Sequence, residues 1–232
     1  MNNSDTIDAQ LLDLMLRAGS RWVLWLLIGL SLAAVAVMID RVWFFLQERP
    51  PKDRLTAAIR AMRDGGAASA LAKLAGARSM EAQVVRICLQ HAADGPNAVE
   101  DHKAAAIETE RLRYEKRLAF LGTLGNNAPF VGLFGTVLGI IRAFHDLAGS
   151  ALQGQGTQAV MTGIAEALVA TGVGLLVALP SVAMYNIFVR HVETTVAAAE
   201  AASREVIAYI KTPAATPATT GAASGGSGKE AA

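Results

Sequence analysis

One carboxylate, Glu166, lies in a long apolar stretch of the sequence that runs from Gly163 to Val189. A carboxylate at the centre of a membrane helix costs on the order of 3 kcal/mol, and such a residue usually belongs to an ion path or a proton relay. Two other interpretations stay open. Glu166 could lie one turn inside the membrane surface and be hydrated, or it could pair with Arg142. We treat Glu166 as the first candidate for an ion-pathway residue.

Two threonines, Thr136 and Thr171, are further polar candidates within apolar segments. Hydroxyl groups of Ser and Thr relay hydrogen bonds in hydrocarbon, but they also bond back to their own helix, so neither threonine is informative alone. Thr171 follows Glu166 by five residues, about 140° around an ideal helix. The two side chains therefore share a cavity only if that cavity is wide or the helix is irregular, and Pro180 could supply irregularity further along.

Small residues recur every three or four positions in two apolar segments, so they form a stripe along one face of each predicted helix. Membrane helices associate through such small faces. The stripes could pack against each other within one chain, or they could line an oligomeric assembly; the spacing does not decide. The first stripe contains Gly125, Ala128, Gly132, Gly135 and Gly139, and the second contains Gly163, Ala167, Ala170, Gly174 and Ala178.

The sequence shows no site for soluble chemistry. The segment GGSGKE (225–230) lacks the first glycine and the Ser/Thr of a phosphate-binding loop. The lone cysteine, Cys88, is expected to be a small apolar residue. We therefore expect no enzymatic activity, catalytic residue, cofactor or metal site. No metal-ligand spacing is visible among the four histidines His91, His102, His145 and His191.

The elements that must position these residues are membrane helices. The 232-residue chain is 53% hydrophobic and 18% charged, more apolar than one soluble core of this size needs. Three segments are long and apolar enough to span a membrane: residues 22–39, 128–145 and 163–189. Trp22, Trp25 and Trp43 lie near the ends of the first, as interfacial aromatic residues do. A cleaved signal peptide is the alternative for that segment, because Ala34-Val35-Ala36 resembles a cleavage site.

The remaining segments are predicted to lie outside the membrane. Residues 40–127 form a solvated helical domain with breaks at Pro50-Pro51, Gly65-Gly66 and Asp94-Gly95-Pro96. The run from Asn97 to Leu121 is expected to be one extended helix that leads into the membrane. We further expect an interfacial segment (1–21), a short linker (146–162), a helix (190–211) and a disordered tail (212–232).

The distribution of basic residues predicts the orientation. Residues 41–127 contain fourteen Lys or Arg, whereas the first 21 residues contain two and the linker contains none. The positive-inside rule then places the helical domain and the C-terminus in the cytoplasm, and the N-terminus and the 146–162 linker in the periplasm. The net charge of +1 argues against a nucleic-acid-binding surface.

Two segments resemble a known family. NNAPFVGLFGTVLGIIRAF (126–144) and GIAEALVATGVGLLVALPSVAMYN (163–186) closely resemble the membrane segments of ExbB and TolQ, in the MotA/TolQ/ExbB proton channel family. The likeness extends through topology and loop size to about residues 10–210. The chain departs from the pattern at Thr162, where relatives often have proline, and in Arg142 and the low-complexity tail, which are not expected.

The resemblance implies an all-α inner-membrane protein that forms a homopentamer. Spans two and three would line a pore around two copies of an ExbD/TolR-like, single-span partner that carries a membrane Asp. Protons, with no other cofactor, would flow along Thr136, Thr171 and Glu166. The helix-packing or pore-lining positions would be Gly132, Gly135, Gly139, Gly163, Ala167, Ala170 and Gly174.

The function that follows is that of a channel or stator subunit of a motor driven by the proton-motive force. The resemblance leaves open whether the motor serves TonB-dependent uptake, the Tol-Pal system or gliding motility, and whether Na⁺ replaces H⁺. The alternative from another class is a non-conducting membrane scaffold that anchors a partner protein. A stand-alone transporter would need internal repeats, and we see none.

Overall fold

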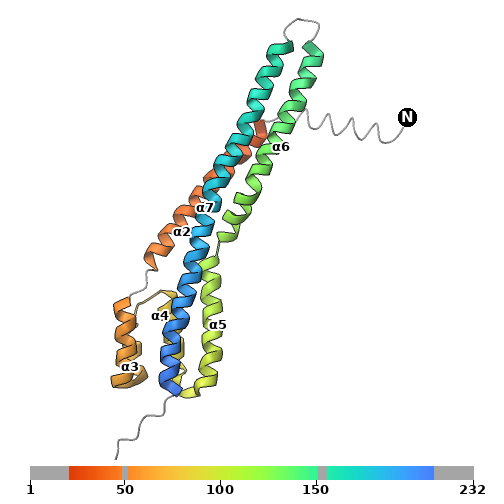
Figure 1. The fold of residues 1–232 in the computed structure, drawn as a ribbon. Helices are drawn as coiled ribbons and strands as arrows, with labels where there is room; N and C mark the ends of the chain where they lie inside the picture. The colour runs from red at the N-terminus through yellow and green to blue at the C-terminus, as the bar shows by residue number, and fades with distance from the viewer. Residues whose placement is uncertain (1–20, 49–51, 151–155, 212–232) are drawn as a thin grey trace, which may run out of the picture.

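The structure, a computed structural model, describes residues 21–48, 52–150 and 156–211. The predicted tail (212–232) and all but Arg21 of the predicted interfacial segment (1–21) lie outside the described residues, as does the break at Pro50-Pro51. Within the described ranges every regular element is a helix, and the chain forms an elongated bundle (Figure 1). In chain order the helices are α2 (Arg21–Gln47), α3 (Lys52–Lys73), α4 (Met80–Gln90), the 3₁₀ turn η1 (Ala92–Asp94), α5 (Pro96–Glu115), α6 (Leu118–Ser150) and α7 (Gly156–Lys211).

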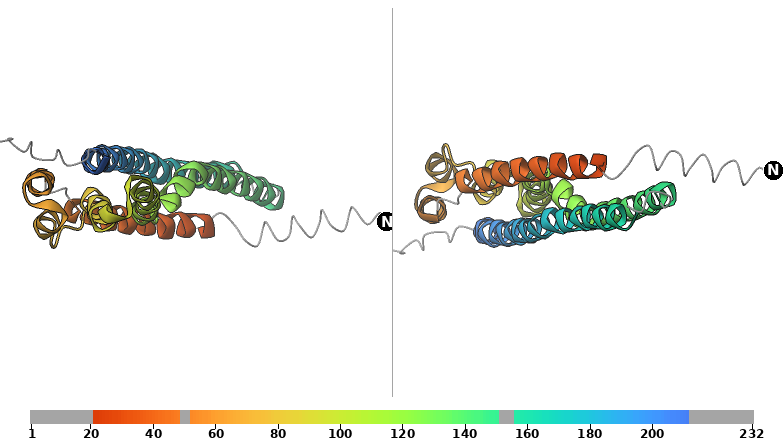
Figure 2. Two further views of the ribbon diagram at one scale, coloured as in Figure 1. Left: turned by 90° about the horizontal axis from the view of Figure 1, so that it is seen from below. Right: turned by 90° about the horizontal axis from the view of Figure 1, so that it is seen from above.

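Three helices, α2, α6 and α7, are long and apolar enough to cross a membrane. They contain the three predicted spans. The helices α6 and α7 lie side by side as a long hairpin, and α2 runs along part of its length (Figures 1 and 2). Only Val23, Leu27, Ala34 and Arg41 of α2 are buried in the chain. This helix therefore packs at the periphery of the bundle.

The membrane helices continue beyond the predicted boundaries. The third span and the predicted helix 190–211 form one uninterrupted helix, α7, which passes through Pro180 without a break. The predicted 146–162 linker is largely helical, because α6 ends at Ser150 and α7 begins at Gly156. Residues 151–155 between them are not described.

The predicted single helix from Asn97 to Leu121 is wrong. The helix α5 ends at Glu115, and α6 begins at Leu118 after a turn in which Arg117 has φ 65°. A non-glycine residue in this left-handed region is uncommon and needs support from elsewhere. The Arg117 side chain supplies it, since its Nη1 lies 2.8 Å from Asp40 Oδ2 on α2. The turn that ends the helix therefore coincides with a contact across the fold that is invisible in the local sequence.

The helices α3, α4 and α5 pack with the C-terminal half of α7 at the end of the bundle away from the α6–α7 connection, and we call this part the helical domain (Figure 1). The predicted breaks at Gly66 (φ 77°) and Gly95 (φ 91°) are confirmed, and Pro96 opens α5. The short α4 lies at the centre, with most of its side chains buried. Cys88 is fully buried there, as expected of a small apolar residue.

Candidate functional site

The small-residue stripes of α6 and α7 face each other within one chain. A Cβ built on Gly132 would lie 2.8 Å from the Ala170 carbonyl oxygen and 3.1 Å from the Thr171 Cα. Farther along the hairpin, a Cβ on Gly139 would lie 2.6 Å from the Cβ of Ala167. Real side chains do not approach so closely, so only glycine fits at these two positions. The backbones of α6 and α7 therefore approach each other closely at both glycines.

Close contacts at glycine recur along the hairpin, and one of them involves α2. Built Cβ atoms on Gly163 and Gly174 would lie 2.6 Å from the Ala143 Cβ and 2.8 Å from the Ala128 carbonyl oxygen. Gly135 lies between two helices, with its built Cβ 2.8 Å from Ala170 Cβ and 3.1 Å from Val23 Cγ1 of α2. The glycine faces thus hold the three membrane helices in register.

The opposite faces of the hairpin are apolar and exposed in the single chain. That these faces, or the glycine faces, line a pore stays a prediction, because the structure holds one chain. Large exposed apolar side chains on these faces include Phe130, Leu133, Phe134, Val137 and Ile140 of α6 and Leu168, Val169, Leu175, Leu176 and Leu179 of α7.

The two candidate threonines differ in how their hydroxyls are satisfied. Thr136 is buried, and its Oγ1 donates to the Leu133 carbonyl oxygen at 2.7 Å. The Oγ1 of Thr171 is also buried, yet it has no hydrogen-bond partner among the described residues. Thr171 packs against Gly132, one helical turn before Thr136 on α6. An unpaired hydroxyl in an apolar setting costs about 1–3 kcal/mol, so the two threonines differ in energy although both hydroxyls are buried.

Glu166 opens into a polar cavity of about 410 Å³ between α6 and α7, and its lining residues lie near the C-terminal end of α6 and the N-terminal end of α7. The Glu166 side chain is exposed. The cavity is also lined by Arg21, Arg142, Asp146, Gln158 and Thr162. Two basic and two acidic side chains therefore share one water-accessible space at this level of the hairpin.

The ion pairs of this cavity bear on the open interpretations of Glu166. Arg142 pairs with Asp146 one turn further along α6, with 3.8 Å between Nε and Oδ2. No ion pair joins Arg142 to Glu166 within the part of the chain described. Arg142 thus pairs with a carboxylate of its own helix, and the role of Glu166 in an ion path stays a prediction.

A second polar group, which the sequence analysis missed, lies where α2 meets the helical domain. We call Glu48, Glu81, Glu110, Arg113 and Tyr114 the junction cluster. Arg113 Nη2 donates to Glu48 Oε2 at 2.8 Å, and the Tyr114 hydroxyl lies 3.4 Å from the same oxygen. The Tyr114 hydroxyl also accepts the Met80 backbone N–H at 3.1 Å. These bonds tie the first membrane helix to α4 and α5.

The other two carboxylates of the junction cluster differ in ion pairing: Glu110 Oε2 lies 3.2 Å from Arg113 Nε, whereas Glu81 has no ion pair among the described residues. Glu81 is 4% exposed, and one oxygen of Glu81 and one of Glu110 are buried without a hydrogen bond in the described structure. Burial raises the pKa of both carboxyls above the ordinary value of 4.5. The members come from three helices far apart in the chain, so no local pattern could have revealed them.

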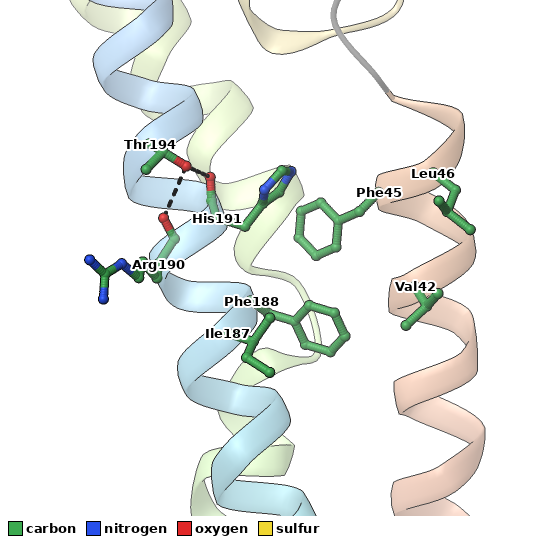
Figure 3. A pocket seen from close by; sticks show the side chains of 8 residues that line it. All are labelled: Val42, Phe45, Leu46, Ile187, Phe188, Arg190, His191 and Thr194. Atoms are coloured by element: carbon green, nitrogen blue, oxygen red, sulfur yellow. Dashed lines mark hydrogen bonds between the residues drawn. The ribbon is translucent and has the colours of Figure 1, made fainter.

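A larger cavity of about 550 Å³ lies between α2 and α7, near the junction cluster (Figure 3). Its walls are mostly apolar: Phe45 and Phe188 stack with ring centroids 5.3 Å apart, and Phe45 meets the His191 ring edge-on at 4.9 Å. The Thr194 hydroxyl donates to the backbone carbonyl oxygens of Arg190 and His191 in its own helix. No carboxylate lines this cavity, so the cavity at Glu166 is the better candidate for an ion path.

Comparison with known proteins agrees with the resemblance. The model of the MotA/TolQ/ExbB proton channel family matches residues 67–201, more than half of the chain. The biopolymer transport protein ExbB of Salmonella typhimurium is 36% identical over 181 residues, which cover 72% of this chain and 72% of that protein.

Two further relatives match over the central region. An ExbB-like biopolymer transport protein of Helicobacter pylori is 53% identical over 85 residues, 37% of this chain and 55% of the relative, so the match spans about half the relative's length. The Tol-Pal system protein TolQ of Pseudomonas aeruginosa is 45% identical over 97 residues, 40% of this chain and 41% of that protein. By the family match and the Salmonella alignment, the chain belongs to the MotA/TolQ/ExbB proton channel family, with ExbB and TolQ proteins among its relatives.

Proposed function

We propose that this chain is the channel subunit of an inner-membrane motor that uses the proton-motive force to do work on the cell envelope. The observation that carries the proposal is Glu166, an exposed carboxylate in a polar cavity between two membrane helices and not paired with the nearby Arg142. Glu166 takes up protons from the outer aqueous space, and Thr171, with its unpartnered hydroxyl, passes hydrogen bonds further into the membrane.

The channel in this proposal is completed by other chains. The glycine faces of α6 and α7 are used within the chain, while the outer faces of both helices expose large apolar side chains. Such faces suit contacts with lipid or with neighbouring membrane helices. We propose a homopentamer that surrounds two copies of a single-span, ExbD/TolR-like partner with a membrane Asp.

The orientation follows the distribution of basic residues. The helical domain and the C-terminus lie in the cytoplasm, and the α6–α7 connection lies in the periplasm together with the N-terminus. The Glu166 cavity, which lies toward that connection, is then the periplasmic entrance, where protons are abundant in an energised cell.

The test is proton flux in vesicles that contain the assembled channel with its partner and a pH-sensitive dye. With an imposed membrane potential we expect the Glu166→Gln variant to conduct protons on the order of a hundredfold more slowly than the unchanged chain. Glu193→Gln is the matched control, because Glu193 is an exposed carboxylate on the same helix beyond the predicted span. Equal rates in the two variants, with normal assembly, would exclude Glu166 from the ion path.

The passive scaffold is the competing function, and an uncoupler separates it from the motor. Collapse of the proton gradient stops a motor but leaves an anchor working. Substitution of Na⁺ for K⁺ in the same vesicles distinguishes the coupling ions, and we expect proton uptake to be independent of Na⁺. The process driven, whether TonB-dependent uptake, Tol-Pal or gliding, is identified by the genes that neighbour this one and by the phenotype of its deletion.

A further inference from the structure

Two histidines and an aspartate converge on the surface of the helical domain, away from the membrane helices. His91 directly follows α4 and caps its C-terminus, Asp94 is the last residue of η1, and His102 lies on α5. The rings of His91 and His102 are stacked, with centroids 3.7 Å apart and 18° between their planes. Asp94 Oδ2 lies 2.7 Å from His91 Nδ1. One ligand atom from each of the three residues lies within 4.8 Å of the others.

We propose that His91, Asp94 and His102 bind a divalent transition-metal ion of the Zn²⁺ class. Two imidazole nitrogens and one carboxylate oxygen are a common ligand set for Zn²⁺ and for similar ions, and they do not suit Ca²⁺ or Mg²⁺, which prefer oxygen ligands. Water would complete the coordination. This proposal is independent of the ion path, because its residues lie on α4, η1 and α5 rather than on the membrane helices.

The backbone holds the three residues in place before any ion binds. His91 ends α4 with its N–H bonded to the Ile87 carbonyl oxygen at 3.1 Å. Gly95, at φ 91°, then reverses the chain, and Pro96 starts α5 so that its second turn returns beside His91. This tight reversal means that little chain entropy is lost when the side chains close on an ion.

The side chains must rotate to share an ion, because two nearly parallel rings do not point their in-plane nitrogen lone pairs at one position. Ligand atoms about 2.1 Å from a tetrahedral Zn²⁺ lie about 3.4 Å from one another. The present separations, at most 4.8 Å, come within reach after rotation of side chains that are at least partly exposed: 38% for His91 and 54% for Asp94. Two protonated imidazoles in this stacked contact would repel each other. A metal ion would instead be bound by the lone pair of one nitrogen from each neutral ring.

The competing explanation is a simple turn in which Asp94 accepts a hydrogen bond from His91. That bond does not need His102, so His102 is the residue that separates the two explanations. We would remove metals from the purified full-length chain in detergent with a chelator and titrate it with Zn²⁺ at pH 7.5 by calorimetry. We expect one ion per chain, with an affinity at least about tenfold lower in both His102→Ala and Asp94→Asn.

Two controls match these variants. Asp101→Asn removes an exposed aspartate adjacent to His102 but outside the cluster, and His145→Ala removes a histidine whose Nδ1 lies 3.7 Å from Asp146 without a second histidine in the group. Neither should change Zn²⁺ affinity. Co²⁺ in place of Zn²⁺ should give the visible absorption of a low-coordinate nitrogen–oxygen site, and this absorption should disappear in His102→Ala.

Binding should also weaken as the pH falls from 7.5 to 5.5, since protons compete with the metal for both imidazoles. If the unchanged chain binds no Zn²⁺, or if His102→Ala and Asp94→Asn bind it as tightly as the two controls, the site does not exist. Because circular dichroism checks the helix content of each variant, loss of binding through unfolding is recognised separately.

Discussion

Gly139 of α6 and Ala167 of α7 meet so closely that a Cβ built on the glycine would lie 2.6 Å from the Ala167 Cβ. Ala167 directly follows Glu166, so this contact fixes the turn of α7 that carries the candidate proton-binding carboxylate. Gly139 also lines the cavity into which Glu166 opens. The packing of the hairpin and the geometry of the candidate site therefore depend on the same pair of residues.

Gly139→Ala should separate the two helices at this point. We expect a loss of about 1–3 kcal/mol in hairpin stability, because the added methyl group has no space and the helix backbones must shift. The measurement is the thermal unfolding of the detergent-solubilised chain, followed by circular dichroism. Gly172→Ala is the control, since a Cβ at Gly172 would meet nothing within 4 Å.

The double variant Gly139→Ala with Ala167→Gly moves the methyl group from one helix to the other. If steric contact is the cause, the double variant should recover most of the stability lost in Gly139→Ala. A Gly139→Ala chain as stable as Gly172→Ala would contradict the close packing of α6 and α7.

The sequence was sufficient to predict the three membrane helices and the two glycine stripes, because both depend on composition and on local periodicity. It also predicted the helix breaks at Gly66 and Gly95, because glycine readily adopts the positive φ found at both positions. It could not predict that the stripes meet each other, since small faces at helical spacing fit a helix of the same chain or of another chain equally well.

Features that depend on contacts between residues far apart in the sequence could not be predicted. The turn after α5 carries the Arg117–Asp40 ion pair, and the junction cluster contains the bond between Arg113 and Glu48, which are 65 positions apart. His91 and His102 meet only because Gly95 and Pro96 reverse the chain between them. No helical or strand periodicity places these residues together, so local pattern gives no signal.

Thr136 and Thr171 should respond differently to replacement by valine. Thr136→Val removes a 2.7 Å hydrogen bond to the Leu133 carbonyl oxygen and should cost about 1 kcal/mol or less, because that oxygen keeps its place in the helix. Thr171→Val removes a buried hydroxyl without a partner among the described residues and should leave stability unchanged or raise it.

Under the proposed function, Thr171→Val should affect proton flux more than Thr136→Val does, although it should affect stability less. Thr171→Val should slow flux in the vesicle assay, and Thr136→Val should slow it less, because the Thr136 hydroxyl already donates within its own helix. Thermal unfolding and flux are measured on the same preparations. A Thr171→Val chain that is both stable and fully conducting would remove Thr171 from the pathway.

Arg113 and Arg111 lie two positions apart on α5 and test the junction cluster. Arg113→Met leaves Glu48, whose side chain is 9% exposed, without its cation, and should destabilise the chain by about 2–3 kcal/mol. Arg111 pairs with Glu115 on the helix surface, where solvent screens the pair, and Arg111→Met should destabilise the chain much less than Arg113→Met.

Chemical denaturation at pH 7.5 compares the two arginine variants. Double substitution with Glu48→Gln should restore part of the stability lost in Arg113→Met, since the Glu48 charge is then removed while Glu110, whose Oε2 lies 3.2 Å from Arg113 Nε, still loses its cation. Equal effects of Arg113→Met and Arg111→Met would mean that the Arg113–Glu48 pair does not join α2 to the helical domain.

Glu81 and Glu100 should give opposite pH dependence of stability. Burial raises the pKa of Glu81 above 4.5, so the folded chain favours the protonated carboxyl. Its contribution to stability is fully present below the unfolded-state pKa and is lost as the pH rises through the raised value. Glu81→Gln, which stays neutral, should therefore raise the Tm at pH 7.5, and this gain should shrink as the pH falls toward 4.

Glu100 provides the control of opposite sign. The Lys211 ammonium, 2.7 Å from Glu100 Oε1, lowers the pKa of this carboxyl below 4.5. The resulting stability is present above the unfolded-state pKa and is lost as the pH falls through the lowered value. Glu100→Gln should therefore lower the Tm slightly at pH 7.5, in contrast to Glu81→Gln. Because the Glu100–Lys211 pair is exposed, salt should abolish its effect while leaving that of the buried Glu81. If both variants shift the Tm in the same direction across this pH range, burial of Glu81 is not what controls its protonation.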